Sequence, residues 1–172
     1  MSILTFQQQT AIKPISKNNA TMHSQLLVEV LNIDLVNLMG AAFVTALKAN
    51  PTDERFTAIL DANTFENCYG NTVHFEGLRY VIAYLVYARY VRAVNVKDTF
   101  NGLVRQNRTE SEHVGDATIR AMQQEAKDAA VSQLKLIEEY LTDNSETYPE
   151  WEKGLSKKGF RPRIINLRKT YK

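Results

Sequence analysis

The sequence predicts a mainly α-helical protein, built as a helical bundle with a long C-terminal helix, a small β-hairpin, and extended N- and C-terminal arms. The first observation is that apolar residues recur three and four positions apart in three long stretches, the pattern of helices buried along one side. The second is that the 172 residues include only 7 glycines and 4 prolines, which favours helices over a turn-rich β architecture. The length suits one domain, and a hydrophobic content of 44% is enough for a core.

The beginning of the chain is expected to be an extended arm. Residues 1–24 are polar, contain the runs QQQT and SKNNAT, and show no sustained periodicity, although a short strand at 3–6 also fits. A first helix is expected over 25–48, because apolar residues recur there at helical spacing. Asp34 is an alternative cap for a second segment, which would break this helix near 32–34.

A short helix and a hairpin follow. Pro51 ends the first helix, and PTDERFTAILDA predicts a second helix that runs to about Ala62, with Thr52 as its candidate N-cap. The alternation on both sides of YGNT, with the turn dipeptide Gly70-Asn71, then predicts a β-hairpin over 64–75.

The second half of the chain predicts two further helices. The first covers 76–94, and NVKDTFNGLVRQN after it breaks the periodicity, which indicates a loop with a strand at 102–106 as an option. A long helix is expected over 110–142, where apolar residues form one stripe. TDNSETYPEWEKG is polar and contains a proline, so we expect a linker there. The expected organisation is therefore an arm, a helical domain and a basic docking tail, at 1–24, 25–148 and 149–172.

The charge of the chain is uneven, although its formal net charge is only +2. Residues 153–172 carry eight basic side chains and no acidic one, whereas residues 1–152 carry 13 basic and 19 acidic side chains, a net charge of −6. A basic tail on an acidic body usually binds an anionic partner, either nucleic acid or an acidic protein surface. Apolar side chains lie among the charges of the tail, so we expect it to dock; the expected contact residues are Phe160, Arg161, Arg163, Ile164, Ile165, Leu167 and Arg168.

No catalytic motif is apparent, and the sequence predicts neither an enzyme nor a cofactor or metal site. The phosphate-binding patterns G-x-x-x-x-G-K-[ST] and G-x-G-x-x-G are absent, as is the nucleophile motif G-x-S-x-G. His113 lies close to Glu112 and Asp116, but such a group is common at a polar helix start, so a metal or catalytic role is the weaker interpretation. Cys68 is the single cysteine, which excludes an internal disulfide, and we interpret it as a small half-buried side chain of the hairpin.

The most apolar stretch, YVIAYLVYARYV at 80–91, predicts a central helix. Its uncharged run covers only 80–88, whereas a membrane span needs about 20 apolar residues. Base stacking uses aromatic residues interleaved with Lys and Arg, but here Val, Ile, Leu and Ala separate the tyrosines. A helix that is apolar nearly all round packs inside its own core or against a neighbouring subunit. Four tyrosines share one arc of this helix and are the expected interface residues: Tyr80, Tyr84, Tyr87 and Tyr90. The sequence leaves open whether that arc meets the long helix of its own chain or the next subunit.

Three segments resemble the head–tail connector proteins, or neck adaptors, of tailed phages, most closely those of crAss-like phages that infect Bacteroidales. The segments are LMGAAFVTALKANPTDERFTAILD, then VHFEGLRYVIAYLVYARYVRAVNVKDTFNGLV, and finally SEHVGDATIRAMQQEA, which opens the long helix. The resemblance covers about residues 35–142.

The resemblance implies a mainly helical structural protein of the virion and not an enzyme. Such proteins form a ring of roughly a dozen copies below the portal protein, where they join capsid to tail and continue the DNA channel. The implied location is the virion neck, after assembly in the host cytoplasm. The implied partners are the portal, further neck or tail proteins, and passing DNA through non-specific contact, with no membrane. The alternative that the residues themselves offer is a small nucleic-acid-binding protein that uses the basic tail.

Overall fold

The computed structural model describes residues 3–16, 20–94, 96–99, 102–105 and 115–151. In chain order they form α1 (Phe6–Ile12), α2 (Ala20–Glu29), a π-helical turn (Val30–Asp34), α3 (Leu35–Met39), α4 (Ala41–Ala49), α5 (Glu54–Leu60), β1 (Asn63–Glu66), β2 (Thr72–Phe75), α6 (Leu78–Ala93), β3 (Val96–Thr99), β4 (Gly102–Arg105) and α7 (Asp116–Asp143). The predicted mainly helical fold with a long C-terminal helix and a small hairpin is confirmed.

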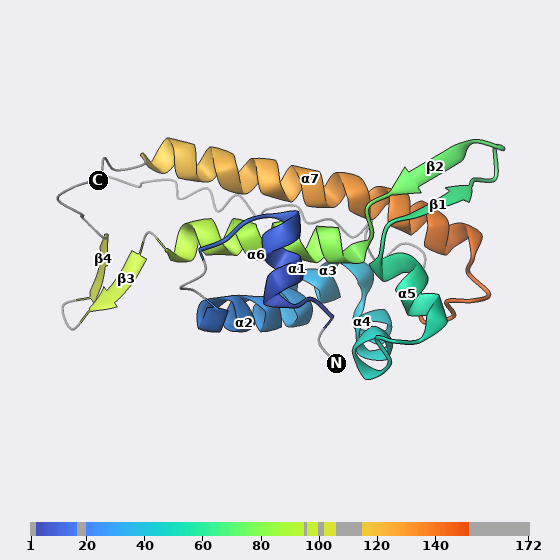
Figure 1. The fold of residues 1–172 in the computed structure, drawn as a ribbon, viewed down its shortest axis with the longest axis horizontal. Helices are drawn as coiled ribbons and strands as arrows, with labels where there is room; N and C mark the ends of the chain where they lie inside the picture. The colour runs from blue at the N-terminus through green and yellow to red at the C-terminus, as the bar shows by residue number, and fades with distance from the viewer. Residues whose placement is uncertain (1–2, 17–19, 95, 100–101, 106–114, 152–172) are drawn as a thin grey trace, which may run out of the picture.

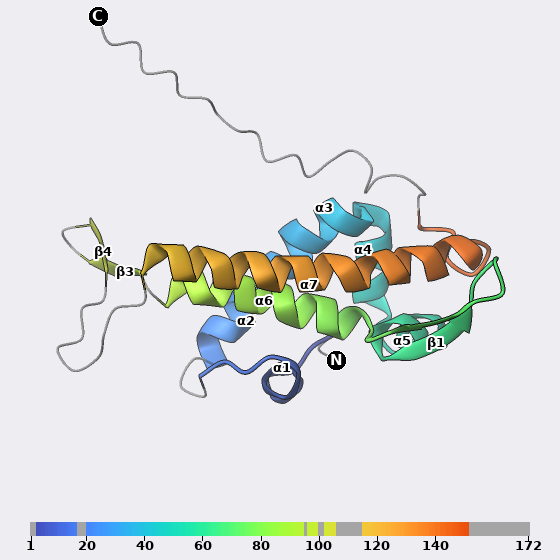
Figure 2. The same cartoon turned by 90° about the horizontal axis from the view of Figure 1, so that it is seen from above.

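Two long helices, α6 and α7, lie side by side and run in opposite directions (Figure 1). α2 lies on the far side of α6 from α7, while α1 lies on one flank of α6 and α3 and α4 lie on the other (Figure 2). α6 is therefore enclosed on most sides, as expected of a helix that is apolar nearly all round. Its buried residues are Leu78, Val81, Ile82, Ala83, Leu85, Val86, Ala88 and Val91, so the prediction of a central helix is confirmed.

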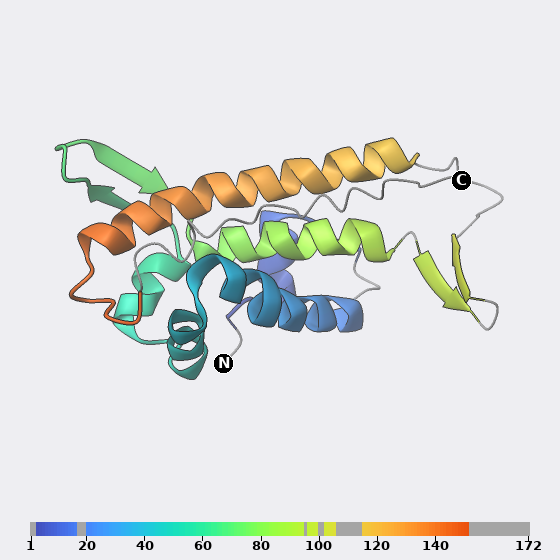
Figure 3. The same ribbon diagram turned by 180° about the vertical axis from the view of Figure 1, so that it is seen from behind.

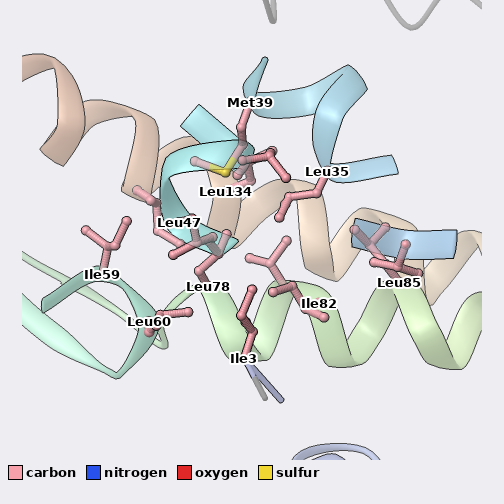
Figure 4. Packing of buried hydrophobic residues seen from close by; sticks show 14 of the residues in the cluster. Ile3, Leu35, Met39, Leu47, Ile59, Leu60, Leu78, Ile82, Leu85 and Leu134 are labelled. Atoms are coloured by element: carbon pink, nitrogen blue, oxygen red, sulfur yellow. The ribbon is translucent and has the colours of Figure 1, made fainter. Parts of the chain in front are cut away.

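The core lies where the first turns of α6 meet α3, α4, α5 and α7 (Figure 4). Leu78 and Ile82 of α6 are fully buried there, and Leu134 of α7 approaches the same cluster. Ile3 joins the cluster from the N-terminal segment. Because each fully buried large aliphatic side chain contributes about 1.5–3 kcal/mol, this cluster is a main source of the driving force for folding.

The helix expected at 25–48 is divided into four segments. α2 begins earlier, at Ala20, and the break indicated near Asp34 is a π-helical turn without a side-chain cap. A second break lies at Gly40, which has φ 87° and ψ 151°, a conformation that other residues rarely adopt. The chain turns at Gly40 before α4 begins, although the apolar spacing continues across the turn.

The π-helical turn brings two carboxylates to one arginine of α6. Its hydrogen bonds join residues five apart, so Glu29 and Asp34 lie on nearly the same side. Arg89 donates from Nε and Nη2 to Asp34, at 2.7 and 3.0 Å, and from Nη1 to Glu29. The hydrogen bond to Asp34 is the main cause that raises the pKa of Arg89, against the opposing effect of burial. The arginine inside the apolar stretch thus connects α6 to the end of α2.

The N-terminal segment is not extended, so the prediction of an extended arm is wrong for residues 3–16. Phe6–Ile12 form α1, which begins with a capping box. The side chain of Thr5 accepts a hydrogen bond from the backbone N–H of Gln8, and the side chain of Gln8 accepts one from the backbone N–H of Thr5. These two bonds satisfy donors that the first turn of the helix leaves free, which stabilises a helix of only 7 residues.

The same segment belongs to the core. Ile3, Leu4 and Ile15 are buried, so apolar side chains anchor it on both sides of α1. Gln9 is also fully buried and donates from Nε2 to the backbone carbonyl of Ala83 in α6, at 3.1 Å. A buried amide needs such a partner, because an unpaired one costs free energy.

The linker expected at 142–154 and the domain boundary expected between residues 148 and 149 are wrong for the residues that the structure describes there, because the chain packs against the core again after α7. Tyr148 and Trp151 are 1% and 8% exposed. Their ring centroids lie 6.4 and 5.9 Å from that of Phe43 in α4. The polar stretch after α7 thus carries two aromatic anchors, and the helical domain extends at least to Trp151.

A salt bridge holds the segment that follows α7 against α5. Arg55 donates to both carboxylate oxygens of Glu150, each at 3.0 Å, and this hydrogen bonding lowers the pKa of the Glu150 carboxyl. The hydroxyl of Tyr148 donates to the backbone carbonyl of Arg55.

The N-cap of α5 is Asp53 rather than the predicted Thr52, since the side chain of Asp53 accepts a hydrogen bond from the backbone N–H of Arg55.

Two antiparallel hairpins project from the helical body at opposite ends (Figure 3). β1 and β2 pair Asn63 with Phe75 and Glu66 with Thr72, which confirms the hairpin predicted at 64–75. The strand predicted at 102–106 is β4, which pairs with β3, in the region that the sequence indicated as a loop. α7 begins at Asp116, and residues 110–114 of the predicted long helix lie outside the described residues.

Candidate functional site

The tyrosines of α6 form one half-buried strip, called here the tyrosine face: Tyr80, Tyr84, Tyr87 and Tyr90. The rings of Tyr80 and Tyr84 are stacked, with centroids 4.3 Å apart and an angle of 23° between the planes. The rings of Tyr87 and Tyr90 lie 6.5 Å apart and are tilted. The spacing of three and four residues explains these pairs, because such residues are neighbours on a helix surface.

The N-terminal segment lies against the tyrosine face. Lys13 Nζ lies 5.2 Å from the ring centroid of Tyr84 and 4.8 Å from that of Tyr87, within the range of cation–π attraction. The backbone N–H of Ser16 donates to the hydroxyl of Tyr90 at 3.3 Å. The tyrosine face therefore contacts Lys13 and Ser16 of the N-terminal segment of its own chain. The sequence did not suggest this contact.

Partial burial, aided by a hydrogen bond with Tyr84, raises the pKa of Tyr80 to about 12. The phenol therefore stays protonated across the physiological range. Tyr80 therefore packs against Tyr84 as a neutral side chain, as expected at the edge of a core.

The β1–β2 hairpin is attached to the end of α7 through aromatic packing. The ring of Tyr140 lies 5.2 Å from that of Phe65 and 5.6 Å from that of Phe75. The backbone N–H of Glu76 donates to the side chain of Gln133, at 3.0 Å. These contacts fix the base of a hairpin that extends beyond the helices (Figure 1).

Asn67 organises the turn of this hairpin. Its Oδ1 accepts from the backbone N–H groups of Tyr69 and Asn71, at 3.1 and 3.0 Å. Its Nδ2 donates to Oε1 of Glu139 in α7, at 2.9 Å. One side chain thus closes the turn and connects it to the helix, so the turn is held in a defined position.

Two side chains at the tip point to solvent. Tyr69 is 83% exposed, an unusual value for a large aromatic side chain. Cys68 is exposed as well, so the expectation of a half-buried cysteine is wrong. The reason is that Phe65 and Phe75 fill the inner side of the hairpin, whereas Cys68 lies in the turn. An exposed aromatic ring on a rigid projection is a typical anchor for a protein partner.

Most of the other residues predicted for the site lie outside the part of the chain that the structure describes. The tail residues Phe160, Arg161, Arg163, Ile164, Ile165, Leu167 and Arg168 lie outside the described residues, as do Glu112 and His113. Asp116 is the exposed first residue of α7. Sequence reasoning missed Lys13, Ser16, Asn67 and Tyr69; only Asn67 carried a signal, as the asparagine that opens a turn.

His23 is buried in α2, 3% exposed, although the sequence placed it in an extended arm. Its ring lies 5.5 Å from that of Phe6 in an edge-on contact. Burial lowers the pKa of His23, because the protonated ring loses its hydration.

Acidification is therefore expected to destabilise the fold through His23. The unfolded chain binds a proton near pH 6.5 and the folded chain only at lower pH, so the free energy of unfolding is greatest above pH 6.5 and falls below it. One group contributes a slope of at most about 1.4 kcal/mol per pH unit. Urea unfolding at several pH values from neutral to mildly acidic measures it. His23→Phe should flatten this slope and the exposed control His74→Gln should keep it; equal slopes in both variants would contradict the assignment.

Within the described ranges, no group of three or more His, Cys, Asp or Glu side chains is arranged to hold a metal ion. The helices in the same part of the chain are each too short or too polar to cross a membrane.

Comparison with known proteins gives one match. No curated protein and no solved structure matches the chain. A family model matches residues 35–161, which is most of the chain and begins at the first residue of α3. The chain therefore belongs to DUF6712, a family of unknown function.

Proposed function

We propose that this protein is a structural virion subunit that forms a ring below the portal of a tailed phage, joins capsid to tail and continues the DNA channel. The observation that carries the proposal is the resemblance of three long segments, which covers about residues 35–142 and so includes α3 to α7. The first segment, LMGAAFVTALKANPTDERFTAILD, begins at Leu38 in α3, and the last, SEHVGDATIRAMQQEA, ends at Ala126 within α7. Together the segments span consecutive elements of the fold rather than one isolated helix.

The projections of the fold support an assembly role. A ring requires each subunit to contact its neighbours through two different surfaces, and a stack of rings requires further contacts above and below. Hairpins project from both ends of the helical body, and one presents Tyr69 to solvent (Figure 1). Exposed aromatic anchors of this kind serve binding more than folding.

The distribution of charge also fits a DNA channel. Residues 1–152 have a net charge of −6, and a lumen that held phosphates tightly would slow the passage of DNA. The basic segment 153–172 provides a separate means of docking on the portal, a neighbouring subunit or DNA.

Co-expression with the portal protein encoded near this gene tests the proposal, since a portal or major capsid gene is expected in the neighbourhood. We expect the two proteins to co-purify as one large particle with several copies of this chain, measured by mass photometry. The chain alone is expected to assemble less, because the portal provides the template. A chain that stays monomeric with its portal present would contradict the proposal.

The second candidate is nucleic-acid binding by the basic tail, favoured by the eight basic and no acidic side chains of residues 153–172. Counterion release predicts that such binding weakens steeply as salt rises. Fluorescence anisotropy with duplex DNA at about 50 mM salt, with and without residues 153–172, distinguishes the candidates. Tail-dependent DNA binding supports this candidate. Portal docking that requires the tail, without DNA binding, supports the ring subunit.

A further inference from the structure

The three most exposed large apolar side chains on the described part of the chain lie in two separate places, while a fourth, Val131 on α7, is 38% exposed. One is Tyr69, at the tip of the β1–β2 hairpin. The other is the end of α2 and the π-helical turn after it, where Val28 is 57% and Ile33 is 49% exposed. The hairpin lies beside α7, whereas α2 lies on the far side of α6, so one chain cannot bring the two together (Figures 1 and 3).

The second place is called here the α2 patch, made of Val28, Asn32, Ile33 and Lys48. The π-helical turn brings residue 33 nearer to the side of residue 28 than a regular α-helix would. Lys48 of α4 reaches the patch, because its Nζ donates to Oδ1 of Asn32 at 2.7 Å. The nearby carboxylates of Glu29 and Asp34 are both paired with Arg89, whose single positive charge offsets one of the two, and Lys48 is the cation within the patch itself.

The tip of the β1–β2 hairpin presents an exposed aromatic ring and a negative charge, which match the apolar side chains and the lysine of the α2 patch. Glu66 is exposed, and its Oε1 lies 3.7 Å from the point where a Cβ atom on Gly70 would stand. A carboxylate therefore accompanies the exposed ring of Tyr69. Asn67 holds the turn in position, so both groups are presented without a large loss of conformational freedom on binding.

We propose that the hairpin tip of one copy docks on the α2 patch of the next copy, with Tyr69 against Val28 and Ile33 and with Glu66 toward Lys48. The inference rests on the proposed function and names the contact between subunits of that ring. The contact joins two different surfaces, so every copy contributes one tip and one patch. Repetition of such a contact builds a ring where the rotation between copies closes, and the portal provides the template for that closure. Apolar complementarity and opposite charges both favour a second copy as the occupant.

The single cysteine of the chain lies next to Tyr69, which allows a direct test. We expect Ile33→Cys, in assemblies formed with the portal and mildly oxidised, to form disulfides with Cys68 of neighbouring copies. Non-reducing gels should show a ladder of multimers. Val131→Cys, an exposed position on α7 outside the patch, should give no ladder, and Ile33→Cys with Cys68→Ser should lose it. Intact assemblies in which Ile33→Cys gives no more multimer than Val131→Cys would overturn the contact.

Charge reversal tests the same contact without cysteine. Glu66→Lys and Lys48→Glu should each lower the yield of assemblies at least about fivefold at low salt, and the double variant should recover most of the loss. Equal yields in wild type and both single variants would count against the pairing, as would a double variant no better than either single one. Portal assemblies that form without this contact would remove the inference and leave the proposed function. The absence of any assembly in the wild type would remove both.

Discussion

Replacing Gly77 with alanine is expected to lower the free energy of unfolding by more than about 3 kcal/mol. Gly77 precedes α6 with φ 88°, a conformation that side chains rarely adopt. An added Cβ would lie 2.5 Å from the carbonyl oxygen of Leu60 and 2.5 Å from the carbonyl carbon of Asp61. Both are backbone atoms that cannot rotate away, so either α5 or α6 must move. Urea unfolding followed by circular dichroism measures the change.

Gly115→Ala is the matched control. Gly115 precedes α7 with φ −62°, and no heavy atom lies within 4 Å of its added Cβ. We expect a change of less than about 1 kcal/mol, because the loss of a flexible N-cap and the smaller entropy of the unfolded chain oppose each other. A Gly77→Ala variant as stable as Gly115→Ala would show that α5 and α6 do not meet as described.

Tyr148→Ala is expected to cost about 3–5 kcal/mol of stability, the range for large aromatic side chains removed from a core. Tyr148 lies among Phe43, Phe56 and Tyr140, at centroid distances of 6.4, 6.4 and 6.2 Å. Its removal leaves a cavity that these rings cannot fill by small movements. Thermal unfolding and urea unfolding both report the loss.

Two further substitutions serve as controls for the loss of the buried Tyr148 ring. Tyr148→Phe keeps the ring and loses the hydroxyl that donates to the carbonyl of Arg55, a hydrogen bond worth about 1 kcal/mol. Tyr69→Ala removes an exposed tyrosine, and in the unassembled chain it should change stability by less than about 0.5 kcal/mol. A small effect of Tyr148→Ala would instead indicate that the chain after α7 is a linker, as its polar sequence suggests.

The elements that the sequence predicts well are those specified by local pattern. α6 is apolar on nearly every side, and its predicted range of 76–94 differs from the observed one by two residues at the start and one at the end. The β1–β2 hairpin follows from the alternation around Gly70-Asn71. Both patterns depend only on residues close together in the chain, so these elements can be predicted without knowledge of the tertiary structure.

The missed elements depend on distant contacts. α1 is too short for a periodic pattern, although Thr5 and Gln8 carry the spacing of a capping box. The burial of Tyr148 and Trp151 depends on Phe43, which lies about a hundred residues earlier. No local pattern reveals a partner at that separation.

The candidate site was predicted in part for the same reason. The arc of tyrosines on α6 follows from helical spacing, but its contact with Lys13 and Ser16 requires the fold of the N-terminal segment. The exposure of Tyr69 follows from the turn made by Asn67 and from the way in which Phe65 and Phe75 occupy the inner side of the hairpin. A tyrosine in a sequence gives no indication of whether it faces the core or the solvent.

Cryo-electron microscopy of the complex formed with the portal protein tests the central proposal most directly. The account predicts a closed ring of copies of this chain, coaxial with the portal and surrounding an open channel. The β1–β2 tip of each copy should lie on the α2 patch of the next. Portal particles that lack this chain, or that carry it as scattered single copies without a ring, would contradict the account.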